Sequence, residues 1–254
     1  MWTKAFCSIL VVVLTACDGP RVRWEQPQAA PADTVGAIGI GDGDSLFYWR
    51  DSSSHRPPDP LMCPGSLSSA ARAGVEFHAW LRRRADSTVV VMASRWDGVT
   101  GTVPAIVDSL DVGQFGCQRP GPSIAISDDG SVHVAYSLKA PEGYGVFFGH
   151  SMNNAINFHD PMIIVYGDRL SATAIASHGP RVAIAYEDPS GKVRRIDVAL
   201  SNTQGHTFEP REHASPDEMT ATHPRIAIRD TVVALSFAGT DTTRRTLRMG
   251  YLRK

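Results

Sequence analysis

After residue 16 the sequence has no apolar run that approaches the roughly 20 residues of a transmembrane helix. It also lacks a charge excess, since 25 lysines and arginines stand against 26 aspartates and glutamates, for a formal net charge of −1. This balance gives no electrostatic reason to expect a nucleic acid partner. Lysine is scarce, so arginine carries most of the positive charge, and its planar guanidinium suits carboxylate contacts.

Motifs that hold metals or cofactors are missing as well. The sequence contains no Cys-x-x-Cys or His-x-x-x-His pair, no glycine-rich phosphate loop and no Gly-x-Ser-x-Gly elbow. The nine histidines are scattered along the chain. Asp42-Gly43-Asp44 and Asp128-Asp129-Gly130 offer too few oxygen ligands at suitable spacing for a calcium loop. The sequence therefore predicts neither a metal nor a cofactor.

The first residues have the pattern of an export signal. Lys4 precedes an apolar run over residues 5–14 that is too short to span a bilayer. The tetrapeptide Leu14-Thr15-Ala16-Cys17 then resembles the lipobox of bacterial lipoproteins. This resemblance implies a signal peptide over residues 1–16 and acylation of Cys17, which would hold the protein to a membrane. An ordinary secretory signal and a cytosolic chain with an apolar start are the alternatives.

Residues 17–33 carry Pro20, Pro27 and Pro31 and no periodic apolar pattern, which is typical of a flexible tether. Asp18 directly follows the cysteine, and in enteric bacteria this position resembles a retention signal for the inner membrane. We therefore expect the periplasmic face of the inner membrane, with the outer membrane as the alternative.

Two cysteines, Cys63 and Cys117, remain in the mature chain besides Cys17. Export would permit a disulfide between them, which in the simple chain model removes roughly 4 kcal/mol of unfolded-state entropy. Two separate buried thiols are the alternative, because sequence does not fix their distance.

Residues 34–254 read as one all-β domain. A short strand that ends in an aromatic recurs at Trp49, Trp80, Tyr136, Tyr186 and Phe237, and another strand precedes four of these across a tight turn. A further strand follows in the middle units. Repeats of near 50 residues and about four strands are typical of propeller blades, so we expect a β-propeller of about five blades, with a β-sandwich array as the alternative.

Two loops after the third strands carry a further resemblance. Residues 151–158 and 201–208, and less clearly 94–98, are similar to Asp-boxes, the Ser-x-Asp-x-Gly-x-Thr-Trp turns of sialidase-type propellers. Asn153 and Thr203 replace the defining aspartate. In that family the box is a turn between the third and fourth strands of a blade, and a folding device.

The last unit ends without a fourth strand. An unpaired edge would be exposed there, so we hypothesise that a strand from residues 22–40 completes it beside residues 245–254.

The sialidase resemblance implies an arginine triad for a substrate carboxylate, a tyrosine nucleophile activated by a glutamate, and an aspartate as acid and base. The early Arg-Ile-Pro signature is absent. Substitute candidates are Tyr186 with Glu187, the arginines Arg119, Arg181 and Arg225, and the carboxylates Asp128 and Asp188. All of them are equally explained as solvated strand ends or turns, as is the run Arg82-Arg83-Arg84, which could otherwise grip an acidic partner.

Because no catalytic set assembles, we expect a lipid-anchored periplasmic binding or assembly module whose partner is an envelope or membrane-complex protein. The alternative is a sialidase-like glycoside hydrolase or a carbohydrate-binding protein that takes a glycan. Fold analogy alone does not separate the two.

Overall fold

The computed structural model describes residues 21–31, 37–49, 55–240 and 243–253. The predicted signal peptide, Cys17 and Asp18 lie outside these residues. Apart from one short 3-10 turn, the regular secondary structure of the described part is β-strand, and none of its helices is long or apolar enough to cross a bilayer.

Three four-stranded antiparallel sheets form consecutive blades, each in chain order. Blade 1 contains β5 (Ser68–Arg72), β6 (Val75–Arg83), β7 (Val89–Trp96) and β8 (Ala105–Asp108). Blade 2 contains β9 (Ser123–Ile126), β10 (Val132–Ala140), β11 (Gly143–Ser151) and β12 (Met162–Gly167). Blade 3 contains β13 (Thr173–His178), β14 (Arg181–Glu187), β15 (Ile196–Ser201) and β16 (Glu212–His213).

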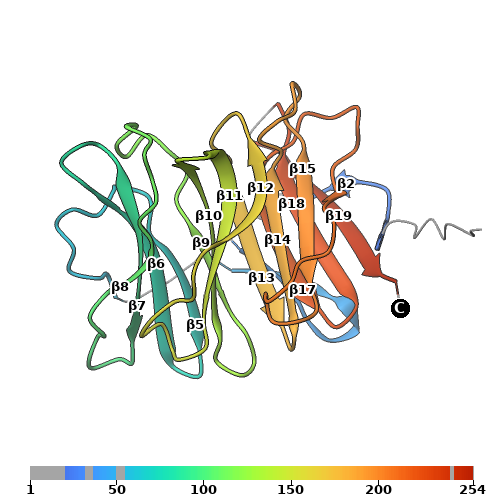
Figure 1. The fold of residues 1–254 in the computed structure, drawn as a ribbon. Coiled ribbons are helices and arrows are strands. Elements are labelled where there is room, and N and C mark those ends of the chain that lie inside the picture. Colours follow the sequence, from blue (N-terminus) through green and yellow to red (C-terminus); the bar gives the residue numbers. More distant parts are fainter. Residues whose placement is uncertain (1–20, 32–36, 50–54, 241–242, 254) are drawn as a thin grey trace, which may run out of the picture.

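Blade 4 is built from both ends of the chain. β17 (Thr222–Arg229), β18 (Val232–Ala238) and β19 (Arg245–Leu252) supply its first three strands. β1 (Val22–Trp24) and β2 (Gln28–Ala29) both pair with β19 along its outer edge, as Figure 1 shows where the blue strands lie beside the red one. The hypothesis that an N-terminal strand completes the last blade is confirmed. The predicted tether of residues 17–33 is wrong over residues 22–29, because the edge of β19 offers them backbone partners.

A two-stranded hairpin occupies the fifth position. It consists of β3 (Ala37–Ile40) and β4 (Leu46–Trp49), joined by the short 3-10 turn η1 (Asp42–Asp44). β3 lies beside β17, and the first strands of blades 1 to 4 neighbour one another in order. The fold is thus a β-propeller with four full blades and one reduced blade, in agreement with the five units predicted from the repeated aromatics.

The repeated aromatics are buried between sheets. Trp80, Tyr136, Tyr186 and Phe237 are each at most 1% exposed. Tyr136 packs among residues of blade 1, Tyr186 among residues of blade 2, and Phe237 among residues of blade 3. Tyr136, Tyr186 and Phe237 therefore fill the space in front of their own blades, whereas Trp80 packs among residues of blade 1 itself and of the segment before it.

A disulfide joins the segments that precede blades 1 and 2. Cys63 and Cys117 have their Cα atoms 5.2 Å apart and share a disulfide bond. Cys63 also belongs to the core between these two blades, and Cys117 packs against it. The bond thus connects the two segments that lead into blades 1 and 2.

The loops after the third strands of blades 2 and 3 have the same hydrogen bonds. In the first, the Ala155 amide donates to Ser151 Oγ at 3.1 Å and the Asn157 amide donates to Asn153 Oδ1 at 3.2 Å. The second has the equivalent bonds from Gly205 to Ser201 Oγ at 2.9 Å and from Thr207 to Thr203 Oγ1 at 3.0 Å. The loop of blade 1 differs, because its turn is organised by Asp97, which accepts from the Val99 and Thr100 amides.

Replacing Tyr136 by alanine should lower the free energy of unfolding by about 3–5 kcal/mol, since the ring is fully buried between two blades. Tyr136→Phe should cost only about 1–3 kcal/mol, from the lost hydrogen bond to Asp108. Urea denaturation followed by circular dichroism measures both. Tyr166→Ala is the control, because that ring is 48% exposed. Equal effects at Tyr136 and Tyr166 would contradict the burial argument.

Candidate functional site

The first strands of all five units surround a central cavity of about 710 Å³. Its walls are isoleucine, alanine and serine for the most part, with one carboxylate, Glu76, from β6. The described lining residues are Ala37, Ile38, Gly39, Ile40, Phe47, Leu67, Ser68, Ser69, Ala70, Ala71, Glu76, Ile124, Ile126, Ile175, Ala176, Ser177, Ile226, Ala227 and Ile228. Cleavage of a glycoside by two carboxylates requires the pair to stand roughly 5–10 Å apart across the sugar. The described walls of this cavity do not supply such a pair.

Tyr186 and Glu187 lie on opposite faces of β14, because successive residues of a strand alternate. Tyr186 packs among residues of blade 2. Glu187 instead reaches toward blade 4, where it accepts a hydrogen bond from the His223 amide at 2.9 Å. It also pairs with Arg194 at 3.4 Å. The structure therefore does not bring the two together as a nucleophile and its base.

The surroundings of Tyr186 also oppose a nucleophilic role. Burial raises the pKa of Tyr186 above its ordinary value, and the nearby charge of Asp197 raises it further. A phenol held in this way stays protonated at neutral pH, whereas a nucleophile needs a lowered pKa or an adjacent base.

Asp197 stands at the centre of a polar group that sequence reasoning missed. It is fully buried on β15, opposite Tyr186 on one side and His213 of β16 on the other. His213 Nδ1 lies 2.6 Å from Asp197 Oδ1, and Arg211 lies 3.6 Å from both Asp197 and Asp188. Burial raises the pKa of Asp197, and the hydrogen bond from His213 opposes this. The sequence alone could not reveal this group, because its members meet through the pairing of β14, β15 and β16.

The polar atoms of two other repeated aromatics also meet aspartates. Trp80 Nε1 donates to Asp59 Oδ2 at 2.7 Å, and the Tyr136 hydroxyl donates to Asp108 Oδ2 at 2.8 Å. Burial alone would raise the pKa of Asp59, but hydrogen bonds from Arg82 and Trp80 bring it below the ordinary value. An aspartate near a buried aromatic thus recurs in blades 1 to 3. The three aspartates occupy different positions, with Asp59 before β5, Asp108 at the end of β8 and Asp197 within β15.

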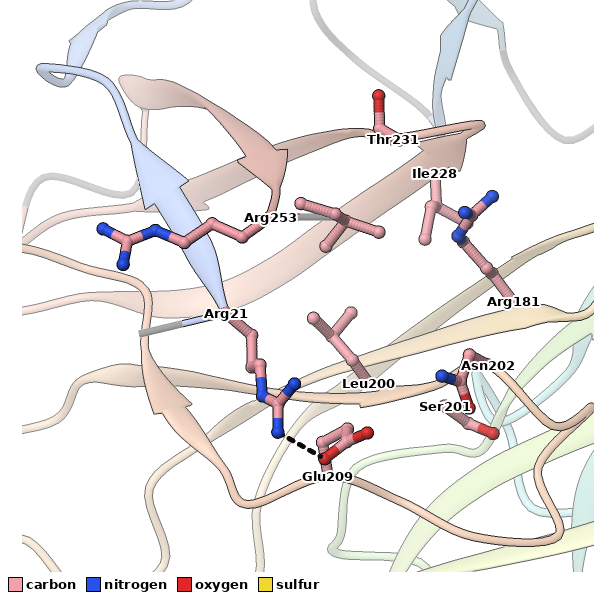
Figure 2. Close-up of a pocket in the computed structure, with 10 residues that line it drawn as sticks. Arg21, Arg181, Leu200, Ser201, Asn202, Glu209, Ile228, Thr231 and Arg253 are labelled. Carbon is pink, nitrogen blue, oxygen red and sulfur yellow. Dashed lines mark ion pairs between the residues drawn. The ribbon is translucent and has the colours of Figure 1, made fainter. Parts of the chain in front are cut away.

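The candidate arginines lie in three separate places. The side chain of Arg119 is fully buried and pairs with Asp111 at 3.0 Å, so it is part of the folded core. Arg225 lies on β17 beside Arg245, whose pKa is lowered to about 10 by burial and by Arg225. Arg181 lines a smaller pocket between blades 3 and 4, shown in Figure 2. The structure does not gather a triad for one carboxylate from these three.

The run Arg82-Arg83-Arg84 is divided in the same way. Arg82 Nε donates to Asp59 at 2.7 Å, and Arg84 donates to the Ser109 carbonyl at 3.2 Å. Arg83 alone points to solvent as an exposed side chain. The run is therefore mainly a hairpin end fixed to its neighbours.

The turn aspartates are engaged by the protein itself. Asp42 pairs with Arg229, and Asp128 pairs with Arg72 at 3.3 Å and accepts from the Gly179 amide at 2.9 Å. Among the described residues, no three histidine, cysteine or acidic side chains are grouped so as to hold a metal ion.

Four histidines that look scattered in the sequence meet between blades 2 and 3. His133 and His150 are cross-strand neighbours on β10 and β11. The ring of His150 lies 4.5 Å from that of His159 and 5.0 Å from that of His206, centroid to centroid. Burial lowers the pKa of both His133 and His150 to about 4, so both are neutral at pH 7. Histidines that are scattered along the sequence are thus brought together in space by strand pairing and by the loop of blade 3.

Comparison with known proteins supports the fold. No family model and no curated protein match this chain. A protein of unknown function from Dyadobacter fermentans DSM 18053 is similar over 74% of this chain and 52% of its own, at 15% identity and a TM-score of 0.50. A Hadza microbial sialidase is similar over 68% and 41%, at 12% identity and a TM-score of 0.49. The GH43_1 enzyme from Xanthomonas citri is similar over 74% and 68%, at 16% identity and a TM-score of 0.44. The chain spans about half the length of the first of these structures, and the likeness concerns the fold alone.

The buried histidines should make stability depend on pH. Their folded pKa values near 4 lie below the ordinary 6.5, so between these values the unfolded chain binds more protons. The free energy of unfolding should therefore fall as the pH drops through this window, by up to about 3 kcal/mol for each ring, since one pKa unit corresponds to about 1.4 kcal/mol. Urea titrations at several pH values measure it. The double variant His133→Gln/His150→Gln should show a flatter dependence, whereas His178→Gln should match the wild type. A wild-type slope in the double variant would contradict this assignment.

Proposed function

We propose that this chain is a lipid-anchored propeller on the periplasmic side of the cell envelope, acting as a non-catalytic binding or assembly module. The observation that supports this most is the central cavity, whose described walls carry one carboxylate among isoleucine, alanine and serine. A ring of this composition has neither the acid and base of a glycosidase nor the forked cationic donors that hold an acidic sugar.

The repeated polar contacts support the same proposal. The candidate nucleophile Tyr186 is buried and faces away from Glu187. The loops at residues 151–158 and 201–208 are, in this proposal, worn Asp-boxes whose serine and third-position acceptors keep the turn after the aspartate was lost. Their hydrogen bonds fix the turns and leave no acidic group for catalysis.

An accessory subunit of a membrane protein complex is the role we propose. A lipid on Cys17 would confine the propeller to the membrane surface and raise its effective concentration near a membrane partner. Asp18 favours the inner membrane, and density fractionation of membranes tests the location. Purification of the native protein in mild detergent, followed by identification of the proteins that accompany it, tests the role. Recovery of the protein alone at each detergent concentration would oppose it.

Changing Cys17 to serine should release the protein from membranes or stop its maturation, because acylation requires the thiol. Membrane fractions washed with high salt and probed with an antibody measure the effect. Cys7→Ser is the control, since that residue lies within the predicted signal peptide. Recovery of Cys17→Ser in washed membranes at the wild-type level would refute the lipid anchor.

A second experiment separates a binding module from a glycosidase. The purified wild type should show no turnover on a panel of sialosides and arabinosides. Glu187→Gln should leave stability and partner capture unchanged, because the amide oxygen still accepts from the His223 amide. Under the glycosidase alternative the wild type would be active, and the same change would lower turnover by about a hundredfold or more. That result would replace our proposal by the alternative.

A further inference from the structure

The pairing of β1 with β19 leaves a very short connection to the proposed lipid. Val22 opposes Leu252, and the Arg253 amide donates to the Arg21 carbonyl at 2.8 Å, so the fold holds the chain from Arg21 onward. Four residue steps separate Arg21 from Cys17. A fully extended chain covers at most about 14 Å in four steps. If Cys17 carries lipid, the part of the propeller around Arg21 must lie near the membrane surface.

That part is the end of blades 3 and 4 where five strand ends meet. It contains the start of β14, the ends of β15, β17 and β19, and the residue before β1. A pocket of about 150 Å³ opens between these ends. Figure 2 shows Arg21, Arg181 and Arg253 around Leu200 and Ile228, which belong to its apolar wall. Arginines far apart in the sequence thus line one pocket, from which the Arg253 side chain extends away on the side opposite Arg181.

The charges at this pocket are unbalanced. Glu209 is the one acidic residue among those that line it, and it pairs with Arg21 at 3.5 Å. The side chains of Arg181 and Arg253 make no hydrogen bond or ion pair within the described part of the chain. Arg181 and Arg253, unpaired among the described residues, therefore line the same pocket as Arg21, the residue four steps from Cys17.

We propose that this end of blades 3 and 4 lies against the bilayer, with Arg181 and Arg253 on the phosphate groups of anionic phospholipids. The inference rests on the proposed lipid anchor and adds a fixed orientation to it. Guanidinium groups bind phosphate oxygens through paired, charge-assisted hydrogen bonds. Each such residue near an anionic membrane surface adds to the attraction, which decays within a Debye length of about 8 Å. The short connection keeps the pocket close enough for this attraction to act.

The orientation also assigns the opposite end of the blades. Glu187 ends β14, and the loop of residues 188–195 follows it at the far end of blade 3 from Arg181. In the proposed orientation this loop points away from the membrane. Surfaces at that end, including Lys192, are then the ones open to a partner in the periplasm.

The test uses the full lipidated protein, reconstituted into vesicles of phosphatidylcholine and phosphatidylglycerol that contain a phospholipid with a benzophenone on its headgroup. After illumination, mass spectrometry locates the crosslinked peptides. We expect crosslinks at residues 178–181, 200–205 and 252–253. Arg181→Glu/Arg253→Glu should lower them by about tenfold or more, given the contribution of each charge near the surface. Phosphatidylcholine alone should lower them similarly.

The control variant is Arg83→Glu/Lys192→Glu, which makes the same charge change at exposed residues of β6 and of the far loop of blade 3. It should leave the crosslinks at the wild-type level. Inorganic phosphate in the buffer should not remove them, and loss with free phosphate would mean that the site takes soluble anions, which overturns the proposal. Crosslinks spread evenly over both ends, or unchanged in the Arg181 and Arg253 variant, would overturn it too. The intact mass of the protein reports acylation of Cys17 separately, so failure of the anchor is distinguished from failure of the orientation.

Discussion

The packing of one large aromatic side chain against the preceding sheet is the contact on which the ring depends. Tyr136, Tyr186 and Phe237 occupy the same place on the second strand of successive blades, and each is buried against its neighbour. Such rings bury much apolar area with few rotatable bonds, so they fix the spacing of the sheets at low entropic cost. Where the aromatic has a polar atom, burial demands a partner, and Asp108 meets that demand for Tyr136.

The same demand accounts for two of the buried carboxylates, because Trp80 donates to Asp59 and Tyr136 donates to Asp108. Asp59, Asp108 and Asp197 look like catalytic carboxylates by their burial, yet each is associated with the aromatic of a different blade. These aspartates lie in three different settings, before β5, at the end of β8 and within β15. The cavity at the centre, where the five first strands do converge, is lined mainly by small and aliphatic side chains.

Much of the fold could be predicted from the sequence because it is periodic. The aromatic repeat located the second strands, the turn residues located the hairpins, and the missing fourth strand after residue 252 indicated closure from the N-terminal side. The candidate site was harder to predict from the sequence, because its contacts join residues on different strands or blades. The alternation of a strand separates Tyr186 from Glu187, although they are adjacent in sequence. Conversely, His133 and His150 of blade 2 and His206 in the loop of blade 3 are separated along the chain and meet only after folding.

The closure of blade 4 also fixes an order of events in folding. β1 is synthesised first and β19 last, so the hydrogen bonds between them have nearly the longest sequence separation that the chain permits. Contacts between residues so far apart in the sequence form late, because the long loop between them must close before they stabilise the fold. By this argument, β1 is expected to pair after the local hairpins of blades 1 to 3 have formed. The residue that would bear the lipid lies just ahead of this strand, so in an anchored chain the last step of folding takes place at the membrane surface itself.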